Sequence, residues 1–357
     1  MDFPILQVDH KELKRLIKAS YRAKRALFVQ GPPRIGKSYT VREAAEELAK
    51  ELGLKGVKVW PEFDLESFNL LDIRVAQHDP VDFSGLPQPN GNRVNWLPPD
   101  FLSLPPETKG LYFFDEINLA PPLVQSALYS IILDRRISTQ KIPEGMGIVA
   151  AGNRLEDNAN VFQMAEPLKA RFLRCELRPP TVEAWTDWAL SRALDARIVA
   201  FIKQNPSYLF RPKEGLYPAL WEFASDVIKG VVDPDEVQLL AGAAVGAAAA
   251  AQLAAFTRLV EHVSLEKILQ SPDSAPLPEE VSERFALVAA LVERYRANPE
   301  RDLLDRLMII ATRLPAEFSV LLLRGIAPLI EQAELAQALV RHGLAETLEK
   351  YLLPVEG

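Results

Sequence analysis

Hydrophobic and polar positions in the first half of the chain follow two alternating periods. Short apolar runs predict buried strands at residues 26–30, 57–63, 110–118 and 146–153. Apolar residues at helical spacing predict helices at residues 10–25, 38–52 and 121–136. Strands that alternate with helices indicate a parallel sheet with helices on both faces.

The second half of the chain has a different pattern. Strand signals end at Thr181, and the remaining apolar spacing is helical, with interruptions at proline-rich segments such as residues 271–280. We therefore predict an α/β domain at residues 1–180. An all-helical domain at residues 181–230 and a helical C-terminal extension at residues 231–357 follow it.

The most apolar stretch lies in this helical half, at residues 239–256, and it contains Gly242 and Gly246 at the spacing of close-packed membrane helices. Alanine is only weakly apolar, Gln252 interrupts the run, and a membrane span needs roughly 20 apolar residues. The pattern favours a tightly packed, alanine-rich soluble helix and no membrane span.

Composition and charge narrow the class of protein. Apolar residues make up 48% of the 357 positions and the net charge is −7, which argues against a protein that coats nucleic acid. Residues 231–357 carry 19 acidic and 11 basic side chains, so the acidity is concentrated there. Cys175 is the single cysteine and the first 30 residues lack the pattern of a secretion signal, so we expect a reducing, cytoplasmic location.

Residues 31–38, "GPPRIGKS", match the phosphate-binding pattern G-x-x-x-x-G-K-[ST] between a predicted strand and a predicted helix. Gly31 and Gly36 allow the tight turn that points backbone N–H groups at phosphate oxygens. Lys37 would contact the outer phosphates and the Ser38 hydroxyl would bind Mg²⁺. The motif predicts a P-loop nucleotide site at the positive end of the following helix.

Two more strands end in polar side chains. Asp115 and Glu116 follow the run "LYFF", where Asp115 is a candidate Mg²⁺ ligand and Glu116 a candidate to orient or deprotonate a water. Asn153 ends the run "IVAAG" and could hydrogen-bond that water or a phosphate. Arg171, in "EPLKARF", is a candidate to face a phosphate.

The ordered motifs "GPPRIGKS", "LYFFDEINLAPPLVQSAL", "DRRI", "IVAAGNR" and "EPLKARF" resemble the AAA+ ATPases, in particular the MoxR and dynein-related branch. The resemblance implies a P-loop NTPase core followed by a helical lid, assembled as a hexameric ring with ATP at the subunit interfaces. It makes Asp115 and Glu116 the Walker B acids, Asn153 the first sensor and Arg171 an arginine finger for the neighbouring subunit's ATP, with Arg174 a weaker candidate for that finger.

The residues expected to bind ATP are Gly31, Pro32, Pro33, Arg34, Ile35, Gly36, Lys37, Ser38, Tyr39 and Asp115, with Ser38 and Asp115 holding Mg²⁺. The resemblance also implies that residues 65–110 hold an insertion and that residues 136–147 form a hairpin, both facing the ring pore or a partner.

Two positions depart from the family pattern. Arg34 stands where the family commonly has glycine, and because only Gly31 and Gly36 are asked for unusual backbone geometry, we expect nucleotide binding to be intact. In the lid, Ala219 stands where the branch has a second-sensor arginine. Arg211 is a candidate replacement. Without a second-sensor arginine, the coupling of ATP binding to lid closure would be weaker.

The resemblance favours an ATPase that remodels, activates or assembles another protein, often one with a von Willebrand factor A domain. The alternative is a nucleotide-dependent scaffold with little hydrolysis, which Arg34 and Ala219 favour. A small-molecule kinase leaves the helical half unexplained, and the acidic C-terminal region argues against a motor that acts on nucleic acid.

Overall fold

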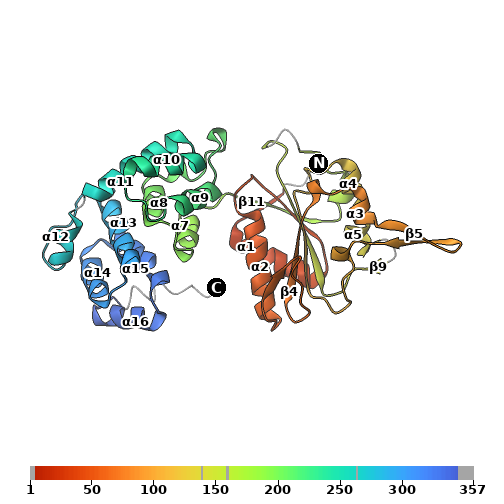
Figure 1. Cartoon of the computed structure of the whole chain (residues 1–357), viewed down its shortest axis with the longest axis horizontal. Coiled ribbons are helices and arrows are strands. Elements are labelled where there is room, and N and C mark those ends of the chain that lie inside the picture. The colour runs from red at the N-terminus through yellow and green to blue at the C-terminus, as the bar shows by residue number, and fades with distance from the viewer. Residues whose placement is uncertain (1–4, 138–139, 158–160, 263, 345–357) are drawn as a thin grey trace. The chain divides into compact units, whose positions relative to one another are not determined.

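In the computed structural model the chain forms two compact units, residues 1–179 and 180–357 (Figure 1). The structure describes residues 5–137, 140–157, 161–262 and 264–344. Both the α/β character of the first unit and the helical character of the second were predicted from the sequence. The further division of the second unit at residue 230 stays a prediction.

The first unit is built on a seven-stranded, wholly parallel sheet of order β1-β11-β2-β10-β7-β4-β3. Its strands are β1 (Leu6–Val8), β2 (Leu27–Gln30), β3 (Val57–Val59), β4 (Phe68–Arg74), β7 (Gly110–Asp115), β10 (Met146–Gly152) and β11 (Leu173–Leu177). The crossovers place β10 between β2 and β7, so the segments that follow these three strands meet at one edge of the sheet.

Helices cover both faces of this sheet. They are α1 (His10–Ala23), α2 (Lys37–Glu51), α3 (Pro80–Ser84), α4 (Pro122–Ala127), α5 (Tyr129–Asp134) and α6 (Glu166–Lys169). Tyr112 and Phe114 of β7 pack in one core with Val124 of α4 and Ile131 of α5. The opposite face is covered by α1 and α2, which contact β10, β7 and β4.

The basic face of α1 is matched by an acidic face of α2. Lys14 and Lys18 lie 2.9 and 2.7 Å from Glu47, and Lys18 also contacts Glu51 at 3.1 Å. Arg22 contacts Glu51 at 2.7 Å. These residues recur at steps of four, so each row follows one helix face. Lys14, Lys18 and Arg22 of α1 therefore bind a neighbouring helix.

Strand β4 was not predicted: Phe68–Arg74, within the region 65–110 that is expected to hold an insertion, form an interior strand of the sheet. Two polar residues concealed it. The Asn69 side chain is buried and its Nδ2 donates to the carbonyls of Asp64, Ser67 and Lys109. Asp72 pairs with Arg42 of α2 at 2.8 Å. The predicted strand at 57–63 is also shorter, ending at Val59 just before the Trp60–Pro61 pair.

Between β4 and β7 the chain forms a two-stranded hairpin, β5 (Leu86–Asn90) and β6 (Arg93–Leu97), turning at Gly91. Its register pairs Pro87 with Trp96 and Pro89 with Val94, so alternation places these four apolar side chains on one face. All ten strand residues are exposed. A second, short hairpin pairs β8 (Arg136–Ile137) with β9 (Gln140–Lys141), as predicted, with residues 138–139 outside the described residues.

The second unit consists of helices in its described residues, apart from one isolated bridge between Arg211 and Leu216. They are α7 (Val182–Ser191), α8 (Ala196–Gln204), α9 (Pro218–Ile228), α10 (Pro234–Val245), α11 (Ala247–His262), α12 (Leu265–Gln270), α13 (Val281–Ala297), α14 (Arg301–Arg313), α15 (Ala316–Ile326) and α16 (Gln332–Arg341). One hydrophobic core runs through them from Trp185 to Leu344.

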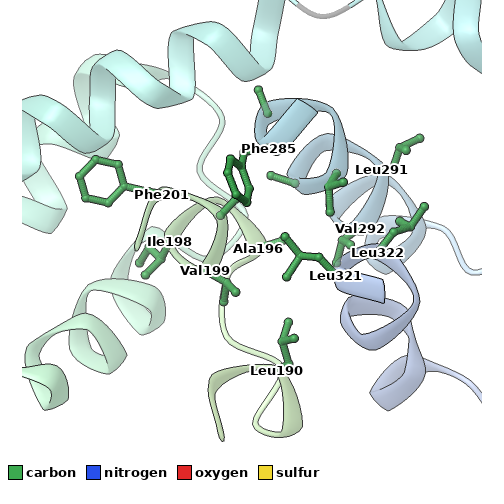
Figure 2. Close-up of a cluster of buried hydrophobic side chains, with 14 of the residues drawn as sticks. Leu190, Ala196, Ile198, Val199, Phe201, Phe285, Leu291, Val292, Leu321 and Leu322 are labelled. Carbon is green, nitrogen blue, oxygen red and sulfur yellow. The ribbon is translucent and has the colours of Figure 1, made fainter. Parts of the chain in front are cut away.

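The centre of that core lies between α8, α13 and α15 (Figure 2). Ile198, Val199 and Phe201 of α8 are buried, and every residue of α13 from Phe285 to Val292 is buried as well. A helix that is apolar on all sides belongs in the interior of a helical unit, with other helices around it. Leu321 and Leu322 of α15 close the cluster in Figure 2.

The alanine-rich stretch at residues 239–256 forms two helices, where a single helix had been predicted. Gly246, at φ +81°, ends α10, and α11 begins at the next residue. The two helices pack closely, since a Cβ on Gly242 would lie 3.7 Å from the Ala250 Cβ. Across the part of the chain that the structure describes, no helix has both the length and the apolar character needed to cross a membrane.

Candidate functional site

The loop of residues 31–36 connects β2 to α2 at the carboxyl edge of the sheet. Gly36 has φ +97°, a conformation that suits glycine, and a Cβ there would lie 3.2 Å from the His10 Nε2. Gly31 has ordinary φ, but a Cβ on it would lie 2.7 Å from the Leu177 carbonyl oxygen. The two glycines are thus required for different reasons, one for backbone conformation and the other for space.

Arg34 also adopts the left-handed conformation, with φ +57°, and its side chain is exposed. The expectation that only Gly31 and Gly36 have unusual backbone geometry is therefore wrong. The position that the family commonly fills with glycine has the geometry that favours glycine, and this chain holds an arginine in it. Such a residue stores about 1–2 kcal/mol of strain, which the surrounding loop must hold.

The other residues of the motif anchor the loop. Ile35 is buried and its carbonyl oxygen lies 2.8 Å from the His10 Nε2, which must carry the proton in this contact. Pro32 is buried, while Pro33 and Tyr39 are half-buried. His10 is the first residue of α1, so the start of α1 contacts the loop directly.

Lys37 is buried, with 8% of its surface exposed, and its three N–H groups are all used. Nζ donates to the carbonyls of Gly31 and Pro32, each at 2.8 Å, and to the Asn153 Oδ1 at 3.0 Å. Burial lowers the pKa of Lys37 to about 8, although Asp115 and other nearby carboxylates oppose the shift. The lysine is thus poised to exchange protein acceptors for a better anion.

The acidic end of β7 lies beside the loop. The Ser38 Oγ donates to the Asp115 Oδ2 at 2.7 Å, which joins the start of α2 to the end of β7. The other oxygen of Asp115 accepts the Glu116 backbone N–H at 2.9 Å. Glu116 has φ +55°, a strained turn that swings its half-buried side chain out of the strand.

Asn153 reaches the same edge from β10. Its backbone is held by Asn118, whose Nδ2 donates to the Asn153 carbonyl at 2.7 Å and whose Oδ1 accepts the Asn153 N–H at 3.1 Å. Gly152 makes room for this pair, since a Cβ there would lie 2.4 Å from the Asn118 Oδ1. The backbone of Asn153 is therefore held on both sides, and its side-chain amide contacts the Lys37 Nζ through Oδ1.

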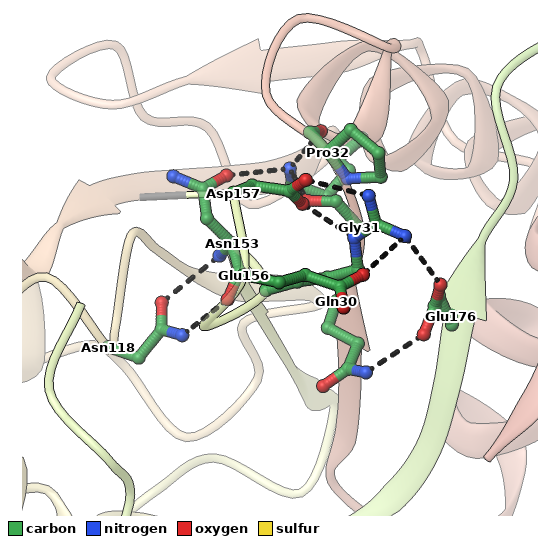
Figure 3. Close-up of polar contacts among 10 residues, drawn as sticks. Gln30, Gly31, Pro32, Asn118, Asn153, Glu156, Asp157 and Glu176 are labelled. Carbon is green, nitrogen blue, oxygen red and sulfur yellow. Dashed lines mark hydrogen bonds and ion pairs between the residues drawn. The ribbon is translucent and has the colours of Figure 1, made fainter. Parts of the chain in front are cut away.

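The next residue, Arg154, contacts three carboxylates, those of Glu156, Asp157 and Glu176, which Figure 3 labels. It binds Asp157 through two hydrogen bonds of 2.5 and 2.7 Å, and its Nη1 lies 3.0 Å from Glu156 and 3.3 Å from Glu176. The second oxygen of Glu176 accepts from the Gln30 Nε2 at 3.0 Å. Sequence inspection missed this network together with Asn118. Its only local signal was the cluster "NRLED" directly after the predicted strand.

The remaining predicted residues lie elsewhere. Arg171 is exposed and precedes β11, whose Leu173 is aligned with Leu27 and whose Glu176 is aligned with Gln30. Its backbone is therefore at the opposite edge of the sheet from the loop, at least roughly 10 Å of strand away. The more weakly favoured Arg174 is half-buried within β11. Arg171 does not join the cluster of its own chain.

The two candidates for the second sensor lie in the second unit. Ala219 is half-buried in the first turn of α9. Arg211 is occupied within its own turn: its guanidinium donates to the backbone carbonyl and hydroxyl of Ser207, pairs with Glu214 at 3.3 Å and stacks 3.8 Å above the Tyr208 ring.

Comparisons with known proteins give remote structural similarities. No protein-family model matches the sequence, and no curated protein matches it. NtrX from Brucella abortus is 14% identical with a TM-score of 0.35, over 93% of this chain and 68% of that chain. The S. cerevisiae Hsp104–ADP complex is 14% identical with a TM-score of 0.36, over 97% of this chain and 46% of that one. The Aeropyrum pernix ORC2 protein, solved as ADPNP–ADP complexes, is 14% identical with a TM-score of 0.31, over 100% and 85%. The assignment of the fold rests on the sheet order and helices described above.

Proposed function

We propose that this chain binds ATP with Mg²⁺ at the carboxyl edge of its sheet and hydrolyses it. The observation that carries this proposal is the convergence of five groups from three separate segments: Lys37 contacts Asn153, and Ser38 contacts Asp115, which is followed by Glu116. A cation, two oxygen ligands, a carboxylate and an amide beside a glycine-bearing loop match the needs of phosphoryl transfer to water.

The loop fits a triphosphate. Its backbone N–H groups and the N-terminus of α2 supply the donors, and the glycine at 36 lets the backbone approach the ligand. Lys37 now donates to the carbonyls of Gly31 and Pro32, and a phosphate oxygen would be a stronger, charged acceptor for the same hydrogens. We infer that Lys37 turns from its loop to the phosphates.

The Ser38 hydroxyl and the Asp115 carboxylate fit Mg²⁺, which prefers hard oxygen ligands and usually takes only one or two from the protein. When bound, the ion would neutralise charge on the phosphates. Glu116 would orient the attacking water and accept its proton, and the Asn153 amide would hydrogen-bond the water or the γ-phosphate without adding charge. Glu116 and Asn153 therefore act on chemistry more than on binding.

We further propose that the chain is an AAA+ ATPase of the MoxR and dynein-related branch, assembled as a ring, that remodels or assembles a partner protein. Arg171 supports the ring. Because it lies at the sheet edge away from its own loop, it can serve as an arginine finger only for a neighbouring subunit. The partner's class, including a protein with a von Willebrand factor A domain, rests on the family resemblance.

A scaffold that binds ATP with little hydrolysis is the second candidate. Arg211 favours the scaffold, because its guanidinium is already bound to Ser207, Glu214 and Tyr208. It therefore does not replace the second-sensor arginine, whose position is occupied by Ala219. The complete set of groups around Lys37 favours the ATPase.

Titration of a fluorescent ATP analogue with Mg²⁺ tests the nucleotide site. We expect Lys37→Ala to weaken binding by at least about tenfold, since a buried charged contact to phosphate is lost. Glu116→Gln should bind as the wild type does, and Lys11→Ala, which removes an exposed lysine of α1, serves as the matched control. Absence of binding by the wild-type protein would contradict the proposal.

A further inference from the structure

Arg154 connects the segment after Asn153 to two neighbouring strands. Its bidentate contact with Asp157 closes a turn just after β10, and its Nη1 reaches Glu176 on β11 at 3.3 Å. Glu176 in turn holds Gln30, the last residue of β2, at 3.0 Å. The connected groups come from residues far apart in the sequence (Figure 3).

The sheet order gives this connection its meaning. Strand β2 lies between β11 and β10, and the phosphate-binding loop leaves β2 directly after Gln30. The chain of contacts from Arg154 through Glu176 to Gln30 therefore spans the end of β2, from one neighbouring strand to the other. On the β10 side it begins one residue after Asn153, whose amide holds Lys37.

The charges show that an arginine is needed. Glu156, Asp157 and Glu176 place three carboxylates around one guanidinium, and Arg154, Asp157 and Glu176 are all mostly shielded, with 25%, 13% and 15% of their side chains exposed. A planar guanidinium can bind one carboxylate with two N–H groups and others with the rest, whereas a lysine offers a single point charge. Without Arg154 the three carboxylates would repel each other close to the loop.

We propose that Arg154 is a positioning residue for hydrolysis. It holds the backbone that follows Asn153 and the end of β2 at one spacing, so that the Asn153 amide stays directed at Lys37 and at the ligand of the loop. It acts through Asn153 and does not itself contact the nucleotide. The inference rests on the proposed ATPase function for its kinetic consequence and on the contacts alone for its structural one.

A kinetic double-mutant cycle tests the action through Asn153. We expect Arg154→Ala to lower kcat by roughly ten- to a hundredfold, the cost of misplacing a reacting group by about 1 Å, while KM for Mg-ATP changes less than about threefold. In an Asn153→Ala background the same substitution should lower kcat little further. Arg154→Lys should recover only part of the rate, because it cannot make the bidentate contact.

The control is Arg42→Ala. Arg42 lies on α2 of the same unit and forms a 2.8 Å ion pair with Asp72 of β4, outside this network. We expect its kcat to equal that of the wild type. Equal fractional losses from Arg154→Ala in both the wild-type and Asn153→Ala backgrounds would overturn the proposal, as would a change confined to KM.

A measurement without turnover separates this inference from the proposed function. In the nucleotide-free protein, hydrogen exchange of backbone amides at residues 30–38 and 152–154 should be faster in Arg154→Ala than in wild type or Arg42→Ala. Glu176→Gln, which retains a hydrogen-bonding side chain, should show a smaller increase at residues 30–38. If Arg154→Ala exchanges faster while the wild-type protein does not hydrolyse ATP, the ATPase is contradicted and the positioning role is kept. Exchange in Arg154→Ala that equals that of the wild type would overturn the positioning role.

Discussion

Replacing Arg34 with glycine should stabilise the first unit, although it removes the largest side chain of the loop of residues 31–36. Arg34 has φ +57°, where its Cβ crowds the backbone, and its side chain is exposed. Glycine adopts this conformation without that crowding. The substitution thus removes strain from a loop whose shape is fixed by its neighbours Ile35 and Gly36.

The magnitude follows from two opposing effects. A left-handed residue with a Cβ costs about 1–2 kcal/mol, whereas a glycine adds about 0.4–1 kcal/mol of backbone entropy to the unfolded chain. The net gain in the free energy of unfolding is therefore about 0.5–1 kcal/mol. For a unit of this size that corresponds to a rise in Tm of roughly 1–4 °C.

Urea unfolding followed by far-UV circular dichroism and by calorimetry measures this gain. Arg34→Ala is the matched control, because it removes the same side chain but keeps the Cβ and its strain. We expect the order of stability to be Arg34→Gly above both wild type and Arg34→Ala. An Arg34→Gly protein that is no more stable than Arg34→Ala would refute the reasoning from backbone strain.

Three further predictions concern other parts of the molecule. Burial lowers the pKa of Lys37 to about 8, so Lys37 in the nucleotide-free protein loses its proton as the pH rises from 7 to 9. The affinity for ATP, measured by fluorescence titration, should therefore fall by roughly tenfold over this range. In Lys37→Arg the affinity should stay nearly constant, because arginine keeps its charge. Arg197→Met should cost the second unit roughly 3–5 kcal/mol in urea unfolding, because it leaves buried Asp195, now 2.6 Å from the guanidinium, without its partner. Trp96→Ser should change the free energy of unfolding by less than about 0.5 kcal/mol, since the β5–β6 hairpin is exposed on both faces, and a larger loss would show that this face packs on something.

The sequence predicted the alternation of strands and helices and the polar groups at the strand ends, because these depend on local pattern. Three strands of the parallel sheet escaped prediction for physical reasons. Strand β1 has only three residues, and β4 contains Asn69 and Asp72, whose polar atoms find partners only after folding. Strand β11 is short and carries Arg174 and Glu176 among its apolar residues.

The loop and its partners could be found from motifs, whereas the network that supports them could not. Glu156, Asp157 and Glu176 look like surface acids in the sequence, and only the order of the strands brings Glu176 beside Arg154. The backbone of Arg34 shows the same limit, since the motif leaves that position free while the fold imposes a left-handed turn on it.

The most direct test of the central claim is steady-state hydrolysis of Mg-ATP measured across protein concentration for the wild type and Glu116→Gln. We predict that the rate per subunit rises with concentration, because Arg171, the proposed arginine finger, lies away from its own loop. We also predict that Glu116→Gln binds ATP but does not turn it over. Equal turnover by Glu116→Gln and wild type would contradict the catalytic role of Glu116. Tight ATP binding by the wild type without hydrolysis at any concentration would contradict the ATPase and leave the scaffold.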